Sequence, residues 1–475
     1  MNKRLLLLQY SLILLLFLLF LQLYAITQNP DYLSFAETQS GKTTVLYQTR
    51  GQIYDRSFTS LTDAVTIRTA VIGDKTAPYA APERDFSLAP HIIGYLSDGK
   101  GVTGIEAAYD TFLSKAGETA TASIPTYGNG NVVPTAELIL SQPTSPTAGV
   151  VLTLDADLQR ICMDVGATFG KGAIVCMDAE SGEILAFCSF PGYTDPAKAL
   201  SDPDSPLYNR VLAAYPIGSV MKPVIAAAAL ETGFSPNMAY NCTGYITIGN
   251  TNFRCHNRAG HGTLNLYGAI ANSCNPYFVQ LTQTLSAETL LHMAQGFGLG
   301  QSVSLAAGIT SASGTLPNSM TAGEKANFSF GQGKLTATPL QICAIYAAIA
   351  NGGDYHTPTL VRGTTTDGCK LNKNPDPVVQ TVITKNTARI LQQALYETVN
   401  STKDALAKSE RVTICGKTGT AQTGRYESGE EVLIGWFAGW FERDGHTIAI
   451  TVMAENAESG NHDAAPLVKQ IAERY

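Results

Sequence analysis

Charged residues are scarce in this chain, and neither sign is abundant enough to indicate a highly charged partner. Asp, Glu, Lys and Arg make up 15% of the 475 residues, and the formal net charge is −7. Long charge runs and internal repeats are both missing. Nucleic-acid binding requires a basic surface, so this composition argues against it. The 45% hydrophobic fraction is ample for a core, and the length suggests two or three domains.

Cysteine patterns typical of metal sites are also missing. The nine cysteines include no C-x-x-C pair and no Cys/His spacing of the zinc-site type, so we expect neither a metal nor a cofactor. Their odd number excludes complete intramolecular pairing. Cys242 and Cys255 are a candidate disulfide across a loop. The alternative is that most of the nine are small buried hydrophobic residues.

The first long apolar run lies near the amino end. Residues 5–26 carry no charge, and at about 1.5 Å per residue such a helix spans the roughly 30 Å hydrocarbon core of a bilayer. Lys3 and Arg4 precede the run, which predicts an amino terminus inside the cell and the remaining chain outside. A cleaved signal peptide is the alternative, but Leu23 and Ala25 make a poor cleavage site. We therefore expect an uncleaved anchor within residues 1–27.

A turn followed by a helix is predicted between Tyr215 and Gly233. Pro216 interrupts the preceding structure, the Ala/Leu run after Lys222 favours a helix, and Gly233 ends it. Ser219 and Lys222 are three residues apart, so they lie on the same face of the helix start. A serine hydroxyl needs a nearby base to become a nucleophile, and a lysine can be that base if burial lowers its pKa.

The Ser-x-x-Lys pattern alone is common by chance. Two further motifs favour a catalytic site over a helix start with a surface lysine. Ser273-Cys274-Asn275 begins 54 residues after Ser219, and Lys417-Thr418-Gly419-Thr420 begins 144 residues after Ser273. Ser-x-x-Lys, Ser-x-Asn and Lys-Thr-Gly in this order are typical of β-lactamases and penicillin-binding proteins.

Two segments nearer the amino end extend this resemblance. Residues 50–56 read Arg-Gly-Gln-Ile-Tyr-Asp-Arg, and residues 101–106 read Gly-Val-Thr-Gly-Ile-Glu. By themselves they predict a tight turn with an Asp/Arg pair and an acidic residue opening a helix. They also resemble the Arg-Gly-x-Ile-x-Asp-Arg and Gly-x-x-Gly-Ile-Glu elements of class B penicillin-binding proteins. The resemblance covers nearly the whole chain, with small departures at Ser57-Phe58 and Ile217.

The pattern of predicted elements agrees with an α+β fold. Residues 172–178 and 182–190 form one predicted β-hairpin, and residues 433–441 and 446–453 form another. The strand at 433–441 is apolar on both faces, so it should be central and covered by helices on each side. Helices are predicted to start at Thr338, Thr384 and Ala464.

The resemblance implies a penicillin-binding, serine β-lactamase-like transpeptidase domain: an antiparallel sheet layered by helices. It also implies an N-terminal pedestal domain of the dimerisation type. The expected domains are residues 1–27 (cytoplasmic amino terminus and transmembrane anchor), 28–148 (pedestal and linker) and 149–475 (transpeptidase domain).

The resemblance also implies roles for individual residues. Ser219 would be the nucleophile and Lys222 its base, with the oxyanion held by the backbone N–H groups of Ser219 and Thr420. The remaining catalytic positions are Ser273, Asn275 and Lys417, the last expected to begin an edge strand; the substrate-binding positions are Thr418, Gly419, Thr420, Gly331 and Gly333. Cys274 is expected to have no role, and His256 and His261 to lie in a solvated loop.

The implied activity is that of a D,D-transpeptidase in the bacterial cell membrane. Through a serine acyl-enzyme it would cross-link stem peptides ending in D-Ala-D-Ala, with possible carboxypeptidase side activity. β-Lactams would be covalent inhibitors, and the implied partner is a membrane glycan polymerase of the shape, division or sporulation family. The alternatives are a membrane-anchored β-lactam sensor, a serine β-lactamase and a non-catalytic cell-wall scaffold.

One sequence feature separates the transpeptidase from the β-lactamase. A hydrolase needs a base that activates water, and the two glutamates considered for this lie in the wrong context. Glu288 starts a helical segment, and Glu324 precedes Lys325 in what we expect to be a polar loop. The short segment before the anchor likewise disfavours a cytoplasmic signalling domain.

Overall fold

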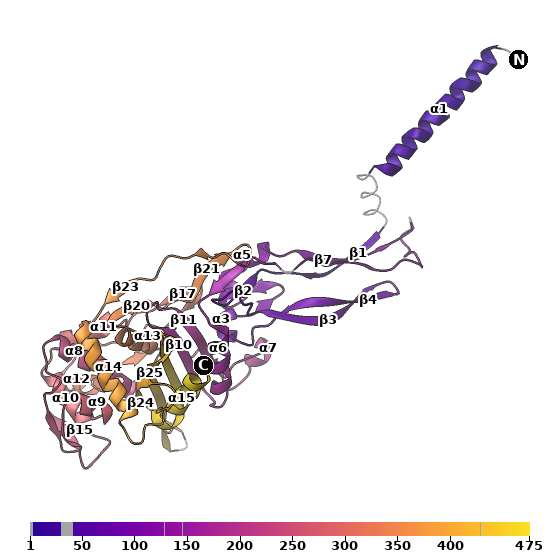
Figure 1. Cartoon of the computed structure of the whole chain (residues 1–475). Helices are drawn as coiled ribbons and strands as arrows, with labels where there is room; N and C mark the ends of the chain where they lie inside the picture. Colours follow the sequence, from indigo (N-terminus) through magenta and orange to yellow (C-terminus); the bar gives the residue numbers. More distant parts are fainter. Residues whose placement is uncertain (1–2, 30–40, 128, 145, 428) are drawn as a thin grey trace. The chain divides into compact units, whose positions relative to one another are not determined.

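The computed structural model describes residues 3–29, 41–127, 129–144, 146–427 and 429–475 (Figure 1). Residues 30–40 of the expected pedestal therefore lie outside the described residues. The chain divides into two compact units. The first contains residues 1–50, 63–83 and 116–146, and the second contains residues 51–62, 84–115 and 147–475.

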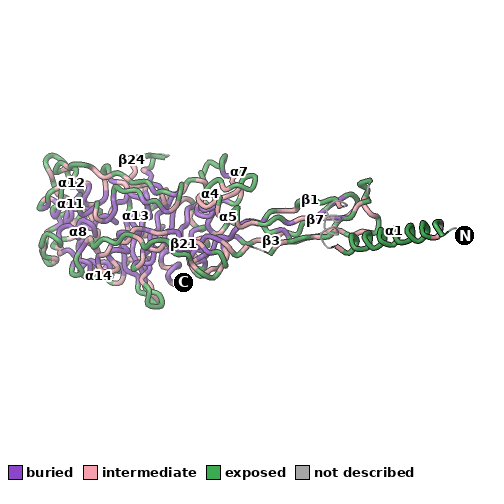
Figure 2. Tube along the Cα trace, turned by 90° about the horizontal axis from the view of Figure 1, so that it is seen from above, coloured by how far each residue is buried: buried purple, intermediate pink, exposed green. Residues whose placement is uncertain are grey.

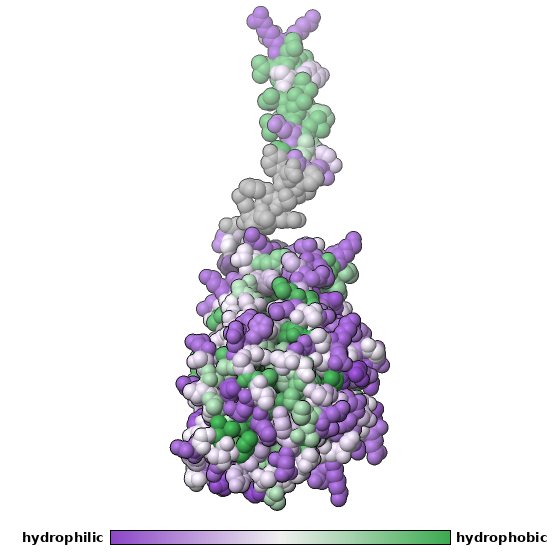
Figure 3. Space-filling model, turned by 90° about the vertical axis from the view of Figure 1, so that its left-hand side faces the viewer, coloured by the Kyte–Doolittle hydropathy of each residue, from purple (hydrophilic) through white to green (hydrophobic). Residues whose placement is uncertain are grey.

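The first unit begins with helix α1 (Lys3–Gln28). Within the described residues, Leu6–Gln28 is the one helical stretch long and apolar enough to span a membrane. Its side chains are exposed and hydrophobic, as the green atoms along this helix show (Figure 3). This supports the expected single-pass anchor.

Strands make up the rest of the first unit. β1 (Gly41–Gln48), β7 (Thr119–Pro125) and β8 (Ile139–Ser141) form an antiparallel sheet, and β3 (Asp63–Ile72) pairs with β4 (Lys75–Arg84). A small hydrophobic core joins them: Ala70, Ile72, Tyr79, Ala81, Ala122 and Ile124. Tyr47 stacks on Tyr79 with ring centroids 5.9 Å apart. That this unit is a pedestal stays a prediction.

A five-stranded antiparallel sheet is the centre of the second unit. Its strand order is β11-β10-β26-β25-β24. The strands are β10 (Gly172–Asp178), β11 (Ile184–Phe190), β24 (Ile414–Glu427), β25 (Glu430–Arg443) and β26 (His446–Glu455). β10 pairs with β11 and β25 with β26, which confirms both predicted hairpins.

Helices cover both faces of this sheet (Figure 1). On one face Trp436 and Trp440 of β25 join the core that includes α8 (Lys222–Glu231) and α13 (Pro339–Ala350). On the other face Phe437 and Phe441 pack with α6 (Ala156–Gly166) and α15 (Ala465–Arg474). The two-sided apolar pattern therefore predicts the position of β25 correctly.

Two predicted helix starts coincide with observed N-caps. Thr338 caps α13 through a capping box with Gln341, and Thr384 caps α14 (Lys385–Asn400). All of α13 up to Ile349 is buried. Figure 2 shows the buried part of the trace, in purple, around α8 and α13.

Shorter elements surround the sheet. The helices are α7 (Pro196–Ala199), α9 (Leu266–Ala271), α10 (Asn275–Gln283), α11 (Ala287–Gly296) and α12 (Ala322–Phe328). The strand pairs are β12 (Tyr215–Pro216) with β19 (Thr336–Ala337), β13 (Tyr240–Cys242) with β16 (Gly262–Leu264), β14 (Tyr245–Ile248) with β15 (Thr251–Arg254), β17 (Ser304–Ala306) with β18 (Ile309–Thr310), and β20 (Asp354–His356) with β23 (Val379–Thr381).

A second sheet brings early parts of the chain into the second unit. β2 (Gln52–Tyr54) pairs in parallel with β9 (Gly149–Leu152), which continues to β21 (Val361–Thr365) and β22 (Asn372–Lys373). Residues 84–115, between β2 and β9 in the sequence, also belong to this unit. They form helix α3 (Pro90–Ile93), the small hairpin β5 (Leu96–Ser97)–β6 (Lys100–Gly101), and helices α4 (Gly104–Ala108) and α5 (Asp110–Lys115). The chain thus enters this unit three times, whereas the sequence predicts one crossing at residues 148–149.

The two motifs of the amino-terminal half form contacts inside this second unit. Asp55 Oδ1 accepts hydrogen bonds from the backbone N–H groups of Ser57 and Thr59, which closes the predicted turn. Arg56 pairs with Glu183, the residue before β11, at 3.1 Å. Glu106, buried in α4, pairs with Arg84 at 2.6 Å. Both motifs are structural here, as their residue types predict.

Candidate active site

Ser219 lies on a short 3₁₀ turn, Gly218–Met221, that leads directly into α8. Gly218 has φ +61°, a conformation that favours glycine. Two hydrogen bonds fix this turn to the surrounding core. Trp436 Nε1 donates to the Pro216 carbonyl at 2.9 Å, and the Tyr346 hydroxyl donates to the Val220 carbonyl at 3.1 Å. The turn is therefore anchored to both β25 and α13.

Lys222 is fully buried, and its amine is surrounded by oxygen atoms. Nζ lies 3.0 Å from Ser219 Oγ, 2.8 Å from the Ser273 carbonyl, 2.9 Å from Ser273 Oγ and 2.8 Å from Asn275 Oδ1. Burial lowers the pKa of Lys222 well below 10.5, and the charge of Lys417 lowers it further. The site therefore favours the neutral amine.

The neutral amine can satisfy these neighbours in one consistent way. It has two N–H donors and one lone pair. The Ser273 carbonyl and Asn275 Oδ1 can only accept, so they take the two N–H groups. The lone pair is left for the hydroxyl of Ser219, because the Ser273 hydroxyl donates to Ser219 Oγ. This arrangement can take a proton from Ser219.

Ser273 completes the network. It lies between α9 and α10 with φ +49°, a conformation uncommon outside glycine. Its hydroxyl donates to Ser219 Oγ at 3.0 Å. Asn275, the first residue of α10, donates through its side-chain amide to the Arg254 carbonyl at 3.3 Å. The structure thus brings Ser219, Lys222, Ser273 and Asn275 into one hydrogen-bonded group.

Lys417 lies on the edge strand β24, but it is the fourth residue of the strand and does not begin it. Its side chain is buried, Nζ donates to the Thr418 carbonyl at 2.9 Å, and burial lowers its pKa to about 8. Gly419 runs close to the nucleophile turn, because a Cβ there would lie 3.1 Å from the Ile217 carbonyl oxygen. The Lys-Thr-Gly segment therefore flanks Ser219.

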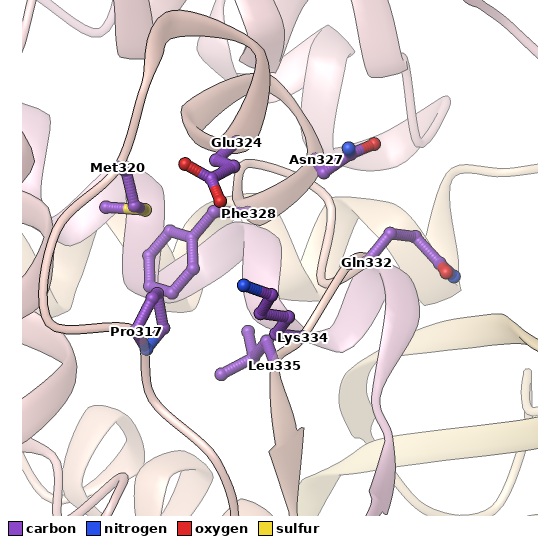
Figure 4. Close-up of a pocket in the computed structure, with 9 residues that line it drawn as sticks. Pro317, Met320, Glu324, Asn327, Phe328, Gln332, Lys334 and Leu335 are labelled. Atoms are coloured by element: carbon purple, nitrogen blue, oxygen red, sulfur yellow. The ribbon is translucent and has the colours of Figure 1, made fainter.

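The Gly-Gln-Gly motif is divided between two environments. The Gly218 N–H donates to the Gly331 carbonyl at 2.9 Å, and a Cβ on Gly331 would lie 2.0 Å from Gly218 oxygen. Gly331 thus packs directly against the Gly218–Met221 turn that carries Ser219. Gly333 instead lines a cavity of about 230 Å³ whose walls, among the described residues, include none from the Ser-x-x-Lys, Ser-x-Asn or Lys-Thr-Gly motifs. Phe328 and Leu335 point into this cavity (Figure 4).

A cavity of about 250 Å³ lies beside the catalytic group. Ser273, Lys417 and Thr418 line it, together with His256 and Asn461. Its walls combine polar side chains with apolar ones such as Phe437, which suits an extended peptide that presents carbonyl and carboxylate groups. His256 is exposed in its loop, as the sequence predicts, whereas Asn461 is not singled out by the sequence.

The expectation that Glu324 lies in a polar loop is wrong. It is the third residue of α12, where its carboxylate accepts hydrogen bonds from the Thr321 N–H and hydroxyl, both at 3.0 Å. This is a capping box, which the Thr-x-x-Glu spacing signals. Glu288 lies in the first turn of α11, as expected. Both glutamates therefore lie in the first turn of a helix, where a negative charge stabilises the helix start.

One group of cysteine and histidine side chains near the site is not singled out by the sequence. Cys242, Cys255, His261 and Cys274 lie together, with one Sγ or ring nitrogen of each within 4.8 Å of all the others. The cysteines are free thiols, so the candidate Cys242–Cys255 disulfide is not formed. His261 lies in the loop between β15 and β16, as the sequence predicts, but its side chain is half-buried. Sequence spacing misses the group because its members come from three separate segments: the end of β13, the loop between β15 and β16, and the residue before α10.

Known proteins carry the same architecture. The description "Penicillin binding protein transpeptidase domain" matches residues 172–473. The chain belongs to this family. Its relatives and its motifs place it among the class B penicillin-binding proteins, which confirms the resemblance noted from the sequence.

Two curated relatives illustrate the match. The Peptidoglycan D,D-transpeptidase MrdA of Haemophilus influenzae is 28% identical over 421 residues, which cover 79% of this chain and 62% of that protein. The Stage V sporulation protein D of Bacillus subtilis is 30% identical over 408 residues, which cover 81% of this chain and 62% of that protein. This chain thus matches about three-fifths of the length of these relatives.

A solved structure agrees with them. Penicillin-binding protein 3 of Mycobacterium tuberculosis, complexed with aztreonam, superposes with a TM-score of 0.71 at 25% identity. The match covers 91% of this chain and 96% of that one. The α+β transpeptidase fold predicted from the sequence is therefore confirmed.

Proposed function

We propose that this protein is a serine D,D-transpeptidase that cross-links peptidoglycan stem peptides. The observation that carries the proposal is the buried, pKa-lowered Lys222 amine 3.0 Å from the Ser219 hydroxyl. A nucleophile and its base within hydrogen-bond reach are the requirement for acyl transfer. The names of the curated relatives support the same chemistry.

In the first step Ser219 Oγ attacks the carbonyl between the two terminal D-Ala residues. Its proton passes to the lone pair of Lys222, and the backbone N–H groups of Ser219 and Thr420 stabilise the negative oxygen. The C–N bond then breaks, and the proton returns to the leaving nitrogen through Ser273, whose hydroxyl contacts both Lys222 and Ser219. D-Ala leaves, and an ester on Ser219 remains.

In the second step the amine of a neighbouring stem peptide attacks this ester. The same groups act in reverse: Lys222 takes a proton from the amine, and Ser219 recovers one as it leaves. Before D-Ala leaves in the first step, Lys417 and the hydroxyls of Thr418 and Thr420 hold the terminal carboxylate of the donor peptide, while Asn275 positions the peptide backbone in both steps. Attack by water in place of the amine gives the carboxypeptidase side reaction.

The membrane setting belongs to the same proposal. α1 anchors the chain with its amino terminus inside the cell, because Lys3 and Arg4 precede the apolar run. The first unit is the pedestal, and the catalytic unit lies outside. A membrane glycan polymerase of the shape, division or sporulation family supplies the strands to be cross-linked, and β-lactams acylate Ser219.

The test uses the full-length chain in detergent with a synthetic stem pentapeptide ending in D-Ala-D-Ala and an amine acceptor. We expect release of D-Ala and a product with the combined mass of the acylated peptide and the acceptor. Ser219→Ala should give neither. Acylation by labelled penicillin without release of D-Ala from the peptide would favour the sensor instead.

A further inference from the structure

Four soft donor atoms meet beside the Ser-x-Asn segment. Cys242, Cys255 and Cys274 are at most 3% exposed, and His261 closes the group from a half-buried position. Cys255 Sγ lies 3.4 Å from His261 Nδ1. Three thiols and an imidazole in one place are the ligand set of a structural zinc site.

The backbone holds these residues in place independently of their side chains. Cys242 ends β13 and lies opposite Gly262 of β16, one residue after His261. The Cys255 N–H donates to the Gly244 carbonyl at 2.8 Å. Gly260 has φ +84°, and a Cβ there would lie 2.2 Å from the Cys242 carbonyl oxygen. The loop from β13 to β16 is thus tightly closed around the thiols.

The spacing suits a metal better than a disulfide. Ligands at tetrahedral zinc, with Zn–S near 2.3 Å and Zn–N near 2.0–2.1 Å, lie about 3.8 Å apart for two sulfurs and about 3.5 Å apart for sulfur and nitrogen. The 3.4 Å contact of Cys255 with His261 agrees with the second figure. A disulfide would join only two of the three cysteines. The third thiol and the imidazole of His261 would then take no part in the bond, whereas a metal ion would bind all four groups.

We propose that Cys242, Cys255, His261 and Cys274 bind one zinc ion in a closed, tetrahedral structural site. Three thiolates and a neutral imidazole fill all four positions and leave the site with one net negative charge. Cys274 lies between Ser273 and Asn275, so the ion fastens the β13–β16 loop to the start of α10. Metal binding itself does not depend on the transpeptidase activity proposed above.

The experiment measures metal in the purified full-length chain in detergent under reducing conditions. After equilibration with zinc and removal of free metal, we expect about one zinc per chain by inductively coupled plasma mass spectrometry. Cys255→Ser and His261→Ala should lose it. Two matched controls should keep it: His256→Ala, the neighbouring histidine outside the group, and Cys369→Ser, an exposed thiol.

A second measurement does not depend on whether the variants fold. Wild-type protein stripped with a chelator is titrated with Co²⁺, and three thiolates in a tetrahedral site should give strong thiolate-to-cobalt charge-transfer and visible d–d absorption that saturates at one equivalent. Absence of stoichiometric zinc and of this spectrum in wild-type protein overturns the proposal. A disulfide among these three cysteines in protein purified without reductant, persisting in the presence of zinc, overturns it as well.

Discussion

Nζ of Lys222 lies 3.0 Å from Oγ of Ser219, at the point where a 3₁₀ turn becomes an α-helix. The turn places the two side chains on the same side of the chain although Pro223 follows Lys222 immediately. Because Pro223 falls within the first turn of α8, its missing N–H removes no hydrogen bond from the helix.

This contact predicts that acylation depends on both side chains. Ser219→Ala should abolish labelling by fluorescent penicillin. Lys222→Met, which keeps the length of the side chain but not the amine, should slow it by about 10²–10⁴, the usual contribution of a general base. Gel fluorescence over time measures both. Labelling of Ser219→Ala, or a Lys222→Met rate near wild type, would contradict the assignment.

Acylation should also depend on pH in a defined direction. Burial and the charge of Lys417 lower the pKa of Lys222, so protonation below that pKa removes the base, and the rate rises as pH increases through it. Lys417 loses its proton near its own pKa of about 8, so the rate with a carboxylate-bearing β-lactam should fall above that pH. Stopped-flow acylation across pH measures this bell-shaped profile.

A variant isolates the alkaline limb of that profile. Lys417→Arg keeps a positive charge at all accessible pH values. Its acylation rate should therefore stay level above pH 8, even if the absolute rate is lower. An alkaline fall that persists unchanged in Lys417→Arg would show that another group causes it.

The contact between Gly331 and Gly218 predicts a further effect on the site. Both Gly331 and Gly333 have positive φ, so alanine at either position strains the backbone by about 1–2 kcal/mol. Only at Gly331 would the Cβ meet backbone, 2.0 Å from Gly218 oxygen; at Gly333 the nearest atom is a side-chain carbon at 3.4 Å. We expect Gly331→Ala to acylate about tenfold or more slowly than Gly333→Ala, a difference of about 1.4 kcal/mol. Equal rates would argue against the close approach.

The lifetime of the acyl-enzyme separates a transpeptidase from a β-lactamase. Glu324 is engaged in the capping box of α12, and Glu288 lies in the first turn of α11, so neither is placed as a base for water. We expect the penicilloyl adduct on the full-length chain to last many minutes by intact-mass spectrometry. Loss within seconds, with catalytic accumulation of penicilloate, would identify a hydrolase.

The proposed orientation of the anchor can be tested in cells. Protease added to intact protoplasts should digest residues 41–475, which lie outside the membrane in the proposed topology. An antibody to an amino-terminal tag should report a protected fragment that contains α1. Complete protection of the large fragment would reverse the orientation.

Sequence reasoning predicts the elements whose signals are local. Thr338-Pro339 marks the start of α13 because proline is favoured at the first helical position, and the two apolar faces of residues 433–441 mark an inner strand. The proposed catalytic residues can be singled out from the sequence because their three motifs are short and ordered. Lys417 was expected at the start of its strand because nothing in the sequence marks the three strand residues that precede it.

The features that were missed depend on contacts between distant segments. Parallel pairing of β2 with β9 joins residues almost a hundred positions apart, and no local pattern signals it. The same is true of the thiol group, in which Cys242 meets Cys274 only after β13 pairs with β16 and α10 packs beside them. A search for short metal-binding spacings cannot find such a site.

The triple entry of the chain into the second unit has a consequence for how the protein is made. Ile53, Ile92 and Leu113 are buried in the core of that unit, yet they leave the ribosome before β9 and the five-stranded sheet exist. These apolar segments remain unpaired with their final core neighbours until more than half of the chain has been synthesised. A fragment that starts at residue 149 would lack part of its own interior, so useful truncations for crystallisation or drug screening should begin before residue 51.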